Sequence, residues 1–329
     1  MPHVPPVELT QRQVDLISKI SERLGAWSER HGGNLSPQLR RENRIRTIQA
    51  SLAIEANTLS FEQVSDLMDG KPVAGPPREI TEVKNAIRAY ENLENWHPWR
   101  VEDFLEAHRL LMDTLREDAG SFRAGGVGIY QGERLVHMVP LADRVPHQVA
   151  DLLGWLRDTD TNPLLAGAIA HYEIEFIHPF SDGNGRIGRL WQTLVLSKWK
   201  PELAWLPIET VVHHRQNDYY AALAASDKAA EAGPFAEFIL EALWERLGST
   251  DQVADQVTDQ VKALLALMGE GDSLSMKELM KRAGLRHRPT FRANYLTPAI
   301  ETGLIEMTDP ESPRSPRQKY RRKRDSERP

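Results

Sequence analysis

A glycine- and arginine-rich stretch between two apolar segments constrains the fold of this chain more than any other feature. Residues 177–190 read IHPFSDGNGRIGRL. The apolar runs on either side, residues 164–177 and 190–199, predict two buried helices. The glycines then lie in the turn that opens the second helix, where free backbone N–H groups and the positive end of the helix dipole favour an anion. The sequence therefore predicts an anion-binding turn between two core helices.

Five side chains of this stretch have the chemistry to hold and move a phosphate group. His178 is the candidate general base, because histidine is the side chain that titrates near neutral pH. Asp182 offers the carboxylate oxygens that Mg²⁺ prefers and often shares with substrate phosphates. The Asn184 amide can donate to a phosphate oxygen. Arg186 and Arg189 carry planar guanidinium groups that suit phosphate recognition.

Two other interpretations of the stretch are open at this point. An ordinary helix-to-helix turn could use a capping Asp, helix-ending glycines and solvated arginines. Alternatively, His171, Glu175 and His178 follow one another at spacings of four and three and could present metal ligands on one helix face. Zinc sites on one helix usually use two histidines four residues apart. These two histidines are seven apart, so we favour the phosphate site.

The residues from His178 to Arg189 match the pattern H-x-F-x-[DE]-G-N-G-R-x-x-R at every fixed position, and the chain therefore resembles the Fic-domain family. The resemblance implies a mainly α-helical bundle that transfers AMP from ATP to a Ser, Thr or Tyr hydroxyl of a target protein, and of itself. It implies His178 as the base and Asp182 as the Mg²⁺ ligand. The nucleotide-binding residues that it implies are Gly183, Asn184, Gly185, Arg186, Ile187, Gly188 and Arg189.

A second match lies upstream, in the string SLAIEAN that begins at Ser51. It resembles the inhibitory motif [ST]-x-x-x-E-[GN] of Fic proteins, and the apolar pattern of residues 44–59 predicts the helix that carries it. The resemblance implies that Glu55, on one helix face with Ser51, pairs with Arg189 and keeps the γ-phosphate of ATP out of its productive position. The sequence departs from the motif at Ala56, where Gly or Asn is expected.

Two further regions extend the resemblance. Residues 125–130 and 133–140 carry glycines and strand-forming residues and predict a β-hairpin. In Fic proteins such a hairpin is a flap that holds the target segment by strand addition. The resemblance also places Tyr220 against the adenine base, although Asp227 stands where the family has Asn. A plain surface hairpin and a core tyrosine are the alternatives.

Composition indicates a globular protein with a sizeable core, since 40% of the 329 residues are hydrophobic. A run of eighteen apolar residues is absent from the sequence, and the first residues lack the pattern of a signal peptide. The chain has no cysteine, which excludes disulfides and thiolate chemistry. We therefore expect a cytoplasmic protein with no membrane partner.

The expected organisation has three parts. Residues 1–100 form an N-terminal helical region that carries the inhibitory helix, with amphipathic helices predicted at residues 11–31 and 79–93. Residues 101–250 form the Fic catalytic core. Residues 251–329 form a linker helix, predicted from a repeated DQV triplet, and a winged-helix domain with a basic tail.

The net charge of the whole chain is −6, although its C-terminal tail is basic. Residues 281–329 hold 13 Lys/Arg against 6 Asp/Glu, a balance of +7 that leaves −13 for the rest. Helices predicted at residues 261–268, 275–283 and 287–303, followed by two strands, resemble the winged-helix class. Its candidate DNA contacts are Arg288, Arg292, Asn294, Arg314, Arg317 and Lys319.

Other functions are open for the C-terminal region and for the chain as a whole. A protein-interaction or dimer module with a solvated tail is the alternative to DNA binding, so a homodimer is one of the expected assemblies. The same Fic site could remove AMP from a modified protein instead of adding it. The chain could also be a DNA-binding regulator whose Fic domain senses a nucleotide.

Overall fold

The chain divides between Leu247 and Gly248 into two compact units, each with its own hydrophobic core. The computed structural model describes residues 4–31, 37–125, 128–131, 134–269, 271–285, 287–301, 304–309, 315 and 317–322. No helix that these residues form has the length and apolar character needed to cross a bilayer.

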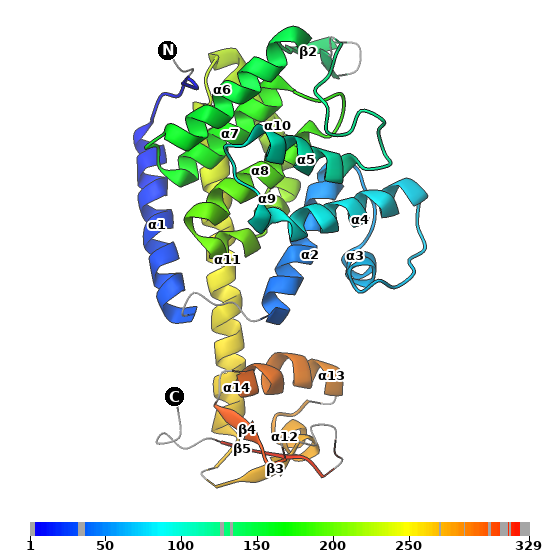
Figure 1. Ribbon diagram of the computed structural model, residues 1–329. Helices are drawn as coiled ribbons and strands as arrows, with labels where there is room; N and C mark the ends of the chain where they lie inside the picture. Colours follow the sequence, from blue (N-terminus) through cyan, green and yellow to red (C-terminus); the bar gives the residue numbers. More distant parts are fainter. Residues whose placement is uncertain are drawn as a thin grey trace. The chain divides into compact units, whose positions relative to one another are not determined.

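The first unit is mainly helical, as predicted (Figure 1). Its α-helices are α1 (Gln11–His31), α2 (Pro37–Ile54), α3 (Phe61–Met68), α4 (Pro77–Glu91), α5 (Val101–Met112), α6 (Val145–Asp158), α7 (Pro163–Ile177), α8 (Asn184–Trp199), α9 (Glu209–His214), α10 (Gln216–Ala229) and the first part of α11 (Gly233–Ala266). Short 3₁₀ helices are η1 (Leu93–Asn95), η2 (Ala142–Arg144) and η3 (Pro201–Trp205). The predicted helix at residues 11–31 is confirmed.

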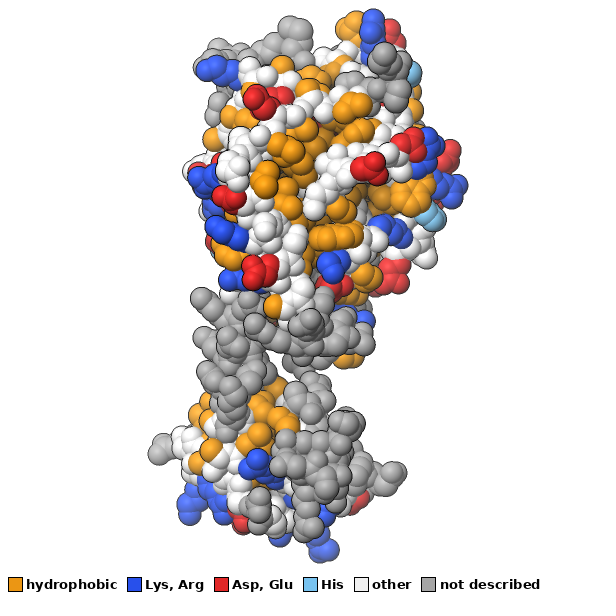
Figure 2. Space-filling view, turned by 90° about the vertical axis from the view of Figure 1, so that its left-hand side faces the viewer, with side chains coloured by type: hydrophobic (Ala, Val, Ile, Leu, Met, Phe, Trp, Pro, Cys, Tyr) orange, Lys and Arg blue, Asp and Glu red, His pale blue; other side chains and the backbone are white. Residues whose placement is uncertain are grey.

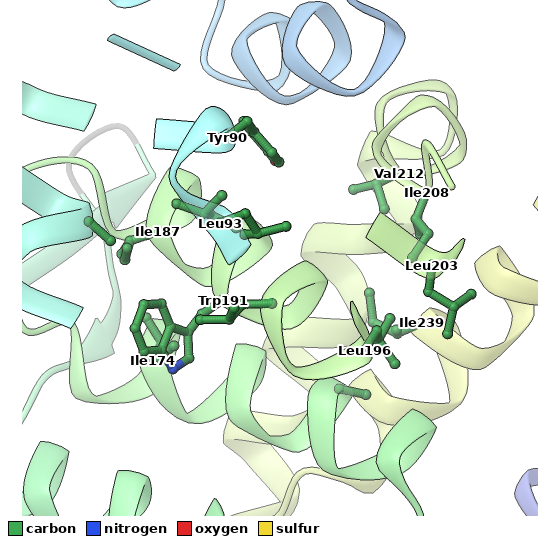
Figure 3. Packing of buried hydrophobic residues seen from close by; sticks show 14 of the residues in the cluster. Tyr90, Leu93, Ile174, Ile187, Trp191, Leu196, Leu203, Ile208, Val212 and Ile239 are labelled. Atoms are coloured by element: carbon green, nitrogen blue, oxygen red, sulfur yellow. The ribbon is translucent and has the colours of Figure 1, made fainter. Parts of the chain in front are cut away.

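Helices α7 and α8 form the centre of this unit. Helix α7 is buried around its whole circumference over residues 164–174, which matches its continuous apolar sequence. Around α8, the fully buried Trp191 ring lies among aliphatic side chains from neighbouring elements (Figure 3). Its indole N–H donates to the Pro98 carbonyl at 3.1 Å. The two helices that flank the motif therefore fix the motif to the core of the unit.

Two helix boundaries next to the predicted site residues differ from the sequence prediction by five residues or more, and both differences come from residues with positive φ. Helix α8 begins at Asn184 instead of residue 190, because Gly183 (φ 85°) completes the turn. Helix α2 ends at Ile54 instead of residue 59. There Ala56 (φ 65°) adopts a left-handed conformation, and the Asn57 amide bonds the Leu52 carbonyl, which closes the helix end.

The predicted hairpin is present in the first unit. Strands β1 (Gly128–Gln131) and β2 (Arg134–Met138) pair antiparallel, with an irregular register between Ile129 and Tyr130. The expected turn residue Gln131 ends β1, and residues 132–133 lie outside the described residues. The chain runs from β2 through η2 into α6.

The second unit combines helices with a small antiparallel sheet. After the end of α11 it contains β3 (Ser273–Ser275), α12 (Met276–Arg282), α13 (Arg288–Phe291), the π-helical turn η4 (Arg292–Leu296), α14 (Thr297–Glu301), β4 (Ile305–Met307) and β5 (Lys319–Arg322). The strand order is β3-β5-β4. The single helix predicted for residues 287–303 is thus interrupted by η4. Strand β3 was not predicted, because it ends at Ser275, whose capping box begins α12 directly after it. Arg314 lies outside the described residues.

The face of the first unit seen in Figure 2 carries hydrophobic side chains along its middle, with Lys, Arg, Asp and Glu mostly toward the margins. The large hydrophobic residues with the highest exposure include Val4 and Leu9, in the segment before α1, and Val14 within α1.

Candidate active site

His178 directly follows the last residue of α7 and has a left-handed backbone conformation (φ 50°, ψ 60°). Its amide donates to the Ile174 carbonyl at 2.9 Å, and its own carbonyl accepts from Arg123 Nε at 2.7 Å. A left-handed non-glycine residue costs about 1–2 kcal/mol and persists only where its surroundings hold it. Backbone strain therefore coincides with the candidate base.

Arg123 fixes the turn that carries His178. Its buried guanidinium donates to carbonyl oxygens of His178, Ile177 and Pro140, and its amide donates to Pro179. Burial lowers the pKa of Arg123. Arg123 is not predicted from the sequence, where the segment before the hairpin reads only as a glycine-rich lead. The available signal was a single arginine two residues before Gly125.

The Asn184 amide shapes the turn from within. Its Oδ1 accepts from the Phe180 amide and its Nδ2 donates to the Phe180 carbonyl, both at 2.9 Å. From the sequence we expect this amide to donate to a phosphate oxygen. In the structure Oδ1 and one N–H of Nδ2 bond the Phe180 backbone, because the turn needs a side chain to satisfy that buried peptide, and the second N–H of Nδ2 is not used in these bonds.

His108 supports the same turn. Its ring stacks on Phe180, with centroids 3.5 Å apart. The Gly120 amide donates to Nδ1, so Nε2 carries the proton and donates to the Asp182 carbonyl at 2.9 Å. Burial lowers the pKa of His108 to about 4, which keeps the ring neutral. His108 is a second positioning residue that the motif did not reveal.

Asp182 and Arg186 form a polar cluster at the start of α8. The Asp182 carboxylate accepts from the Gly183 amide at 2.7 Å and from Arg186 Nη2 at 3.2 Å, and its other oxygen lies 3.6 Å from Arg78 Nη2. Arg186 is 5% exposed, and its Nη1 lies 3.7 Å from Glu82 Oε1. Its Nε and Nη1 make no hydrogen bond to any described residue. Spare guanidinium donors therefore remain beside a half-exposed carboxylate.

Arg189 is held by the end of α2. Its Nη2 donates to Glu55 Oε1 at 2.7 Å and to the Ser51 carbonyl at 3.1 Å, and its Nε donates to Ser51 Oγ at 3.0 Å. The Arg189 side chain is 2% exposed, whereas that of Glu55 is 36% exposed. Burial alone would lower the pKa of Arg189, but the Glu55 carboxylate raises it overall. The structure thus brings together Arg189, Glu55 and Ser51, the residues of the inhibitory contact that the resemblance implies.

Gly185 lies against the ion pair of Arg189 and Glu55. A Cβ at Gly185 would come 2.5 Å from Glu55 Oε1, 3.0 Å from Arg189 Nη1 and 3.2 Å from Glu175 Oε1. Burial raises the pKa of Glu175 to about 7, and the Tyr219 hydroxyl donates to it at 3.2 Å. A residue larger than glycine at this position would displace the pair.

The metal interpretation of His171, Glu175 and His178 finds no support in the geometry. His171 Nδ1 lies 2.6 Å from Gln192 Oε1, and burial lowers the pKa of this ring to about 3. Among the described parts of the chain, no three His, Asp or Glu side chains gather in a way that could hold a metal ion. His171 is buried within α7, whereas His178 lies at the end of this helix.

Three of the residues that were expected to bind the nucleotide contact other parts of the protein. The Ile187 side chain is fully buried in the core (Figure 3). A Cβ at Gly188 would come 2.8 Å from His171 Cδ2, so this glycine serves the close contact of α8 with α7. The structure thus gives both residues packing roles. Tyr220 is 50% exposed, and Gln216 Nε2 donates both to its hydroxyl, at 3.4 Å, and to the Ile54 carbonyl, at 2.9 Å. Its ring therefore lies near the end of α2.

Two family profiles match the chain. One, described as "Fic/DOC family", matches residues 98–196. The other, described as "Filamentation induced by cAMP protein Fic-like, C-terminal domain", matches residues 259–322. They cover the helices around the motif and most of the second unit.

Curated relatives include the proteins named protein adenylyltransferase fic-1 from Caenorhabditis briggsae and Caenorhabditis elegans, at 31% and 30% identity. Each match covers 61% of this chain and 40% of the relative. The chain therefore spans about two fifths of the length of these curated relatives.

Solved structures of similar proteins span more of the chain. A Fic family protein from Desulfovibrio desulfuricans G20 is 55% identical, with 98% of both chains covered and a TM-score of 0.74. A Fic-1 structure from Caenorhabditis elegans, at 24% identity and a TM-score of 0.55, covers 73% of this chain and 70% of its own, and shares the fold. With its motif, its helical bundle and a relative that matches it over almost its whole length, the chain belongs to the Fic family.

Proposed function

We propose that this chain transfers AMP from ATP to a hydroxyl group of a protein, and that it modifies itself in the same way. The observation that carries the proposal is the meeting of three groups at the junction of α7 and α8. His178 ends one helix, while the Asp182 carboxylate and the spare donors of Arg186 lie where the other begins. The names of the curated relatives point to the same activity.

The start of α8 supplies the anion site. The first N–H groups of a helix have no partner within the helix, and the dipole adds positive potential there. Arg186 adds two nitrogen atoms that lack a hydrogen-bond partner among the described residues, and it is 95% buried. Buried N–H donors without a hydrogen bond are costly, so an anionic ligand that accepts from Nε and Nη1 supports both binding and stability.

In the proposed reaction His178 accepts the proton of the target hydroxyl. The oxygen attacks the α-phosphorus, a new P–O bond forms, the bond to the β-phosphate oxygen breaks, and pyrophosphate leaves. Positioning and charge stabilisation contribute most to such phosphoryl chemistry. Arg123, His108 and Asn184 contribute by fixing the turn, since each bonds its backbone.

Asp182 fits the Mg²⁺ ion that the family implies. Mg²⁺ is usually held by one or two carboxylates, with water and substrate phosphates as the other ligands. The Asp182 carboxylate is 37% exposed and lies at the anion site, so one of its oxygens can serve as such a ligand. The bound ion would neutralise charge on the phosphates.

We further propose that Glu55 inhibits the enzyme by occupying Arg189. The pair is an ion pair with a charge-assisted hydrogen bond at 2.7 Å, and Ser51 accepts two further hydrogen bonds, from Nε and Nη2 of the same guanidinium. If Arg189 is the γ-phosphate ligand, ATP binds productively only after Glu55 leaves. A half-exposed glutamate one residue beyond the end of α2 can leave more easily than one within the helix.

The test compares Glu55→Gln with Glu42→Gln, which changes an equivalent charge earlier on α2. Each variant is incubated with ATP and Mg²⁺, and mass spectrometry measures the AMP added to the chain. We expect Glu55→Gln to raise self-modification about tenfold or more, the effect of losing about 1.4 kcal/mol of competition. Equal activity of the two variants would refute inhibition by Glu55. Loss of AMP from a modified protein would favour the removal reaction instead.

A second candidate function is DNA binding by the second unit. It is favoured by exposed basic residues on its described surface, among them Arg288, Arg292, Arg317 and Lys319. Contacts of this kind with DNA phosphates weaken steeply with salt. The test is binding of the full chain to duplex DNA at increasing salt. Absence of binding at low salt would exclude this function.

A further inference from the structure

A small cavity beside the C-terminal half of α7 is separate from the groups assigned above. It has a volume of about 200 Å³. Its walls include Pro6 from the N-terminal segment, Asp151 from α6, and Tyr172, Glu173, Phe176 and Ile177 from α7. This is below the roughly 300 Å³ at which sites for drug-sized ligands begin, so it suits a group the size of one side chain.

Glu173 is the unusual group in this cavity. The residue is 6% exposed, and it makes no hydrogen bond or ion pair with any residue that the structure describes. Burial raises the pKa of its carboxyl group to about 7. Among the described residues of the unit, the carboxyl groups of the buried Glu209 and the partly buried Glu175 each have a donor: Thr193 for Glu209, and Tyr219 for Glu175. Glu173 alone of these three faces a cavity instead.

The other walls complement a cation. Asp151 adds a second carboxylate, which is 32% exposed. The aromatic walls are Tyr172 and Phe176, whose ring centroids lie 6.0 Å apart. The Tyr172 hydroxyl donates to Asp227, so it leaves Glu173 without a donor, while Asp151 Oδ2 lies 3.6 Å from His147 Nε2. Among the described residues that line the cavity there is no lysine or arginine.

We propose that this cavity binds a primary ammonium group carried on a short alkyl stem. The ammonium pairs with Glu173 and Asp151, and the stem packs on the rings of Tyr172 and Phe176 and on Ile177. Carboxylates and aromatic faces both stabilise a cation that has lost its water, and apolar walls accommodate the methylene groups. A partner for Glu173 also removes the cost of an unpaired buried carboxylate.

Two sources supply this chemistry, namely the side chain of a lysine in a bound protein or a free small amine. Phe176 and Ile177 directly precede His178, so either ligand would contact the end of the helix that carries the proposed base. The inference concerns binding alone and does not depend on the proposed transfer reaction.

The experiment measures binding of n-butylamine to the full chain at pH 8 by calorimetry and by the shift in melting temperature. n-Butanol, which has the same stem without the charge, is the control ligand. We expect saturable binding of the amine, a higher melting temperature, and a loss of affinity of at least about tenfold in Glu173→Gln. Asp160→Asn, a change at an exposed residue between α6 and α7, is the matched control and should bind as the parent does.

Three outcomes would overturn the proposal: no binding of the amine, equal binding of the alcohol, or unchanged affinity in Glu173→Gln. If Glu173→Gln folds poorly, Asp151→Asn replaces it as the test variant. We expect this variant also to lose affinity for the amine, although the Asp151 carboxylate is more exposed. Nα-acetyl-lysine amide distinguishes the sources. Binding as tight as that of butylamine indicates a lysine side chain, and binding of the free amine only indicates a small metabolite amine.

Discussion

The two units of this chain differ in where they keep their charges. The first unit buries Arg186, Arg189, Glu173 and Glu209, each at most 6% exposed. In the described part of the second unit the core is apolar, and Gln318 is the buried polar residue. A buried charge costs several kcal/mol unless its partners are well placed. The first unit therefore carries buried charges that need well-placed partners, while the described charges of the second unit lie on an exposed surface.

The strongest test of this comparison is His178→Ala. Loss of a general base typically slows a reaction by about 10²–10⁴-fold. We therefore expect AMP incorporation, measured by mass spectrometry in a Glu55→Gln background, to fall by at least about a hundredfold. His147→Ala, at a histidine that is 82% exposed, is the control and should leave the rate unchanged. A rate near that of the parent would remove His178 from the mechanism.

The second test is the pair of variants Arg189→Ala and Arg189→Ala/Glu55→Gln. Groups that act on each other have non-additive effects, so the double variant should behave as Arg189→Ala alone does. We expect both to need about tenfold more ATP for half-maximal activity, since a charge-assisted contact is lost. Higher activity of the double variant than of Arg189→Ala would show that Glu55 acts on a group other than Arg189.

The parts of this site that follow from local sequence patterns or from the family resemblance are predictable. The apolar runs predict the helices on either side of the turn, glycines and strand-forming residues predict the hairpin, and the resemblance implies the Arg189–Glu55 pair. Arg123 and His108 were missed, because their contacts are with backbone atoms of residues distant in the chain, which no local pattern encodes.

The sequence was least informative about which motif residues face a ligand. Asn184 bonds the turn itself, and Ile187 and Gly188 belong to the packing of α8. The direction of each side chain depends on where α8 begins. That boundary was set by the positive φ of Gly183, which the apolar pattern could not locate.

The third test sharpens the role of strain at the end of α2. Ala56 has a φ of 65°, a conformation that costs an alanine about 1 kcal/mol or more and costs glycine nothing. Ala56→Gly should stabilise the helix end that presents Glu55, although glycine also has the larger unfolded-state entropy. We expect basal self-modification to fall about two- to fivefold and the melting temperature to stay level or rise. Higher basal activity would contradict a strained inhibitory segment.

The fourth test uses the buried carboxyl group of Glu173. Because its pKa is raised to about 7 in the folded chain from an ordinary value near 4.5, the folded state holds a proton that the unfolded state releases. The free energy of unfolding therefore decreases as pH rises from about 4.5 to 7 and stays low above that. At pH 8 we expect Glu173→Gln to be more stable by on the order of 1 kcal/mol, measured by urea unfolding. The gain should disappear at pH 5, and a variant less stable at pH 8 would show that the carboxylate has an unseen partner.

The smallest effect is expected for an exposed charge of the second unit. Arg292 lies in η4 and is exposed, so Arg292→Gln should change the free energy of unfolding by no more than about 0.5 kcal/mol. If the second unit binds DNA through this surface, the same variant should lower the slope of log affinity against log salt by about 1, because one phosphate contact is lost. A large loss of stability would instead place Arg292 among the structural charges, and the contrast between the two units would then fail at this exposed position.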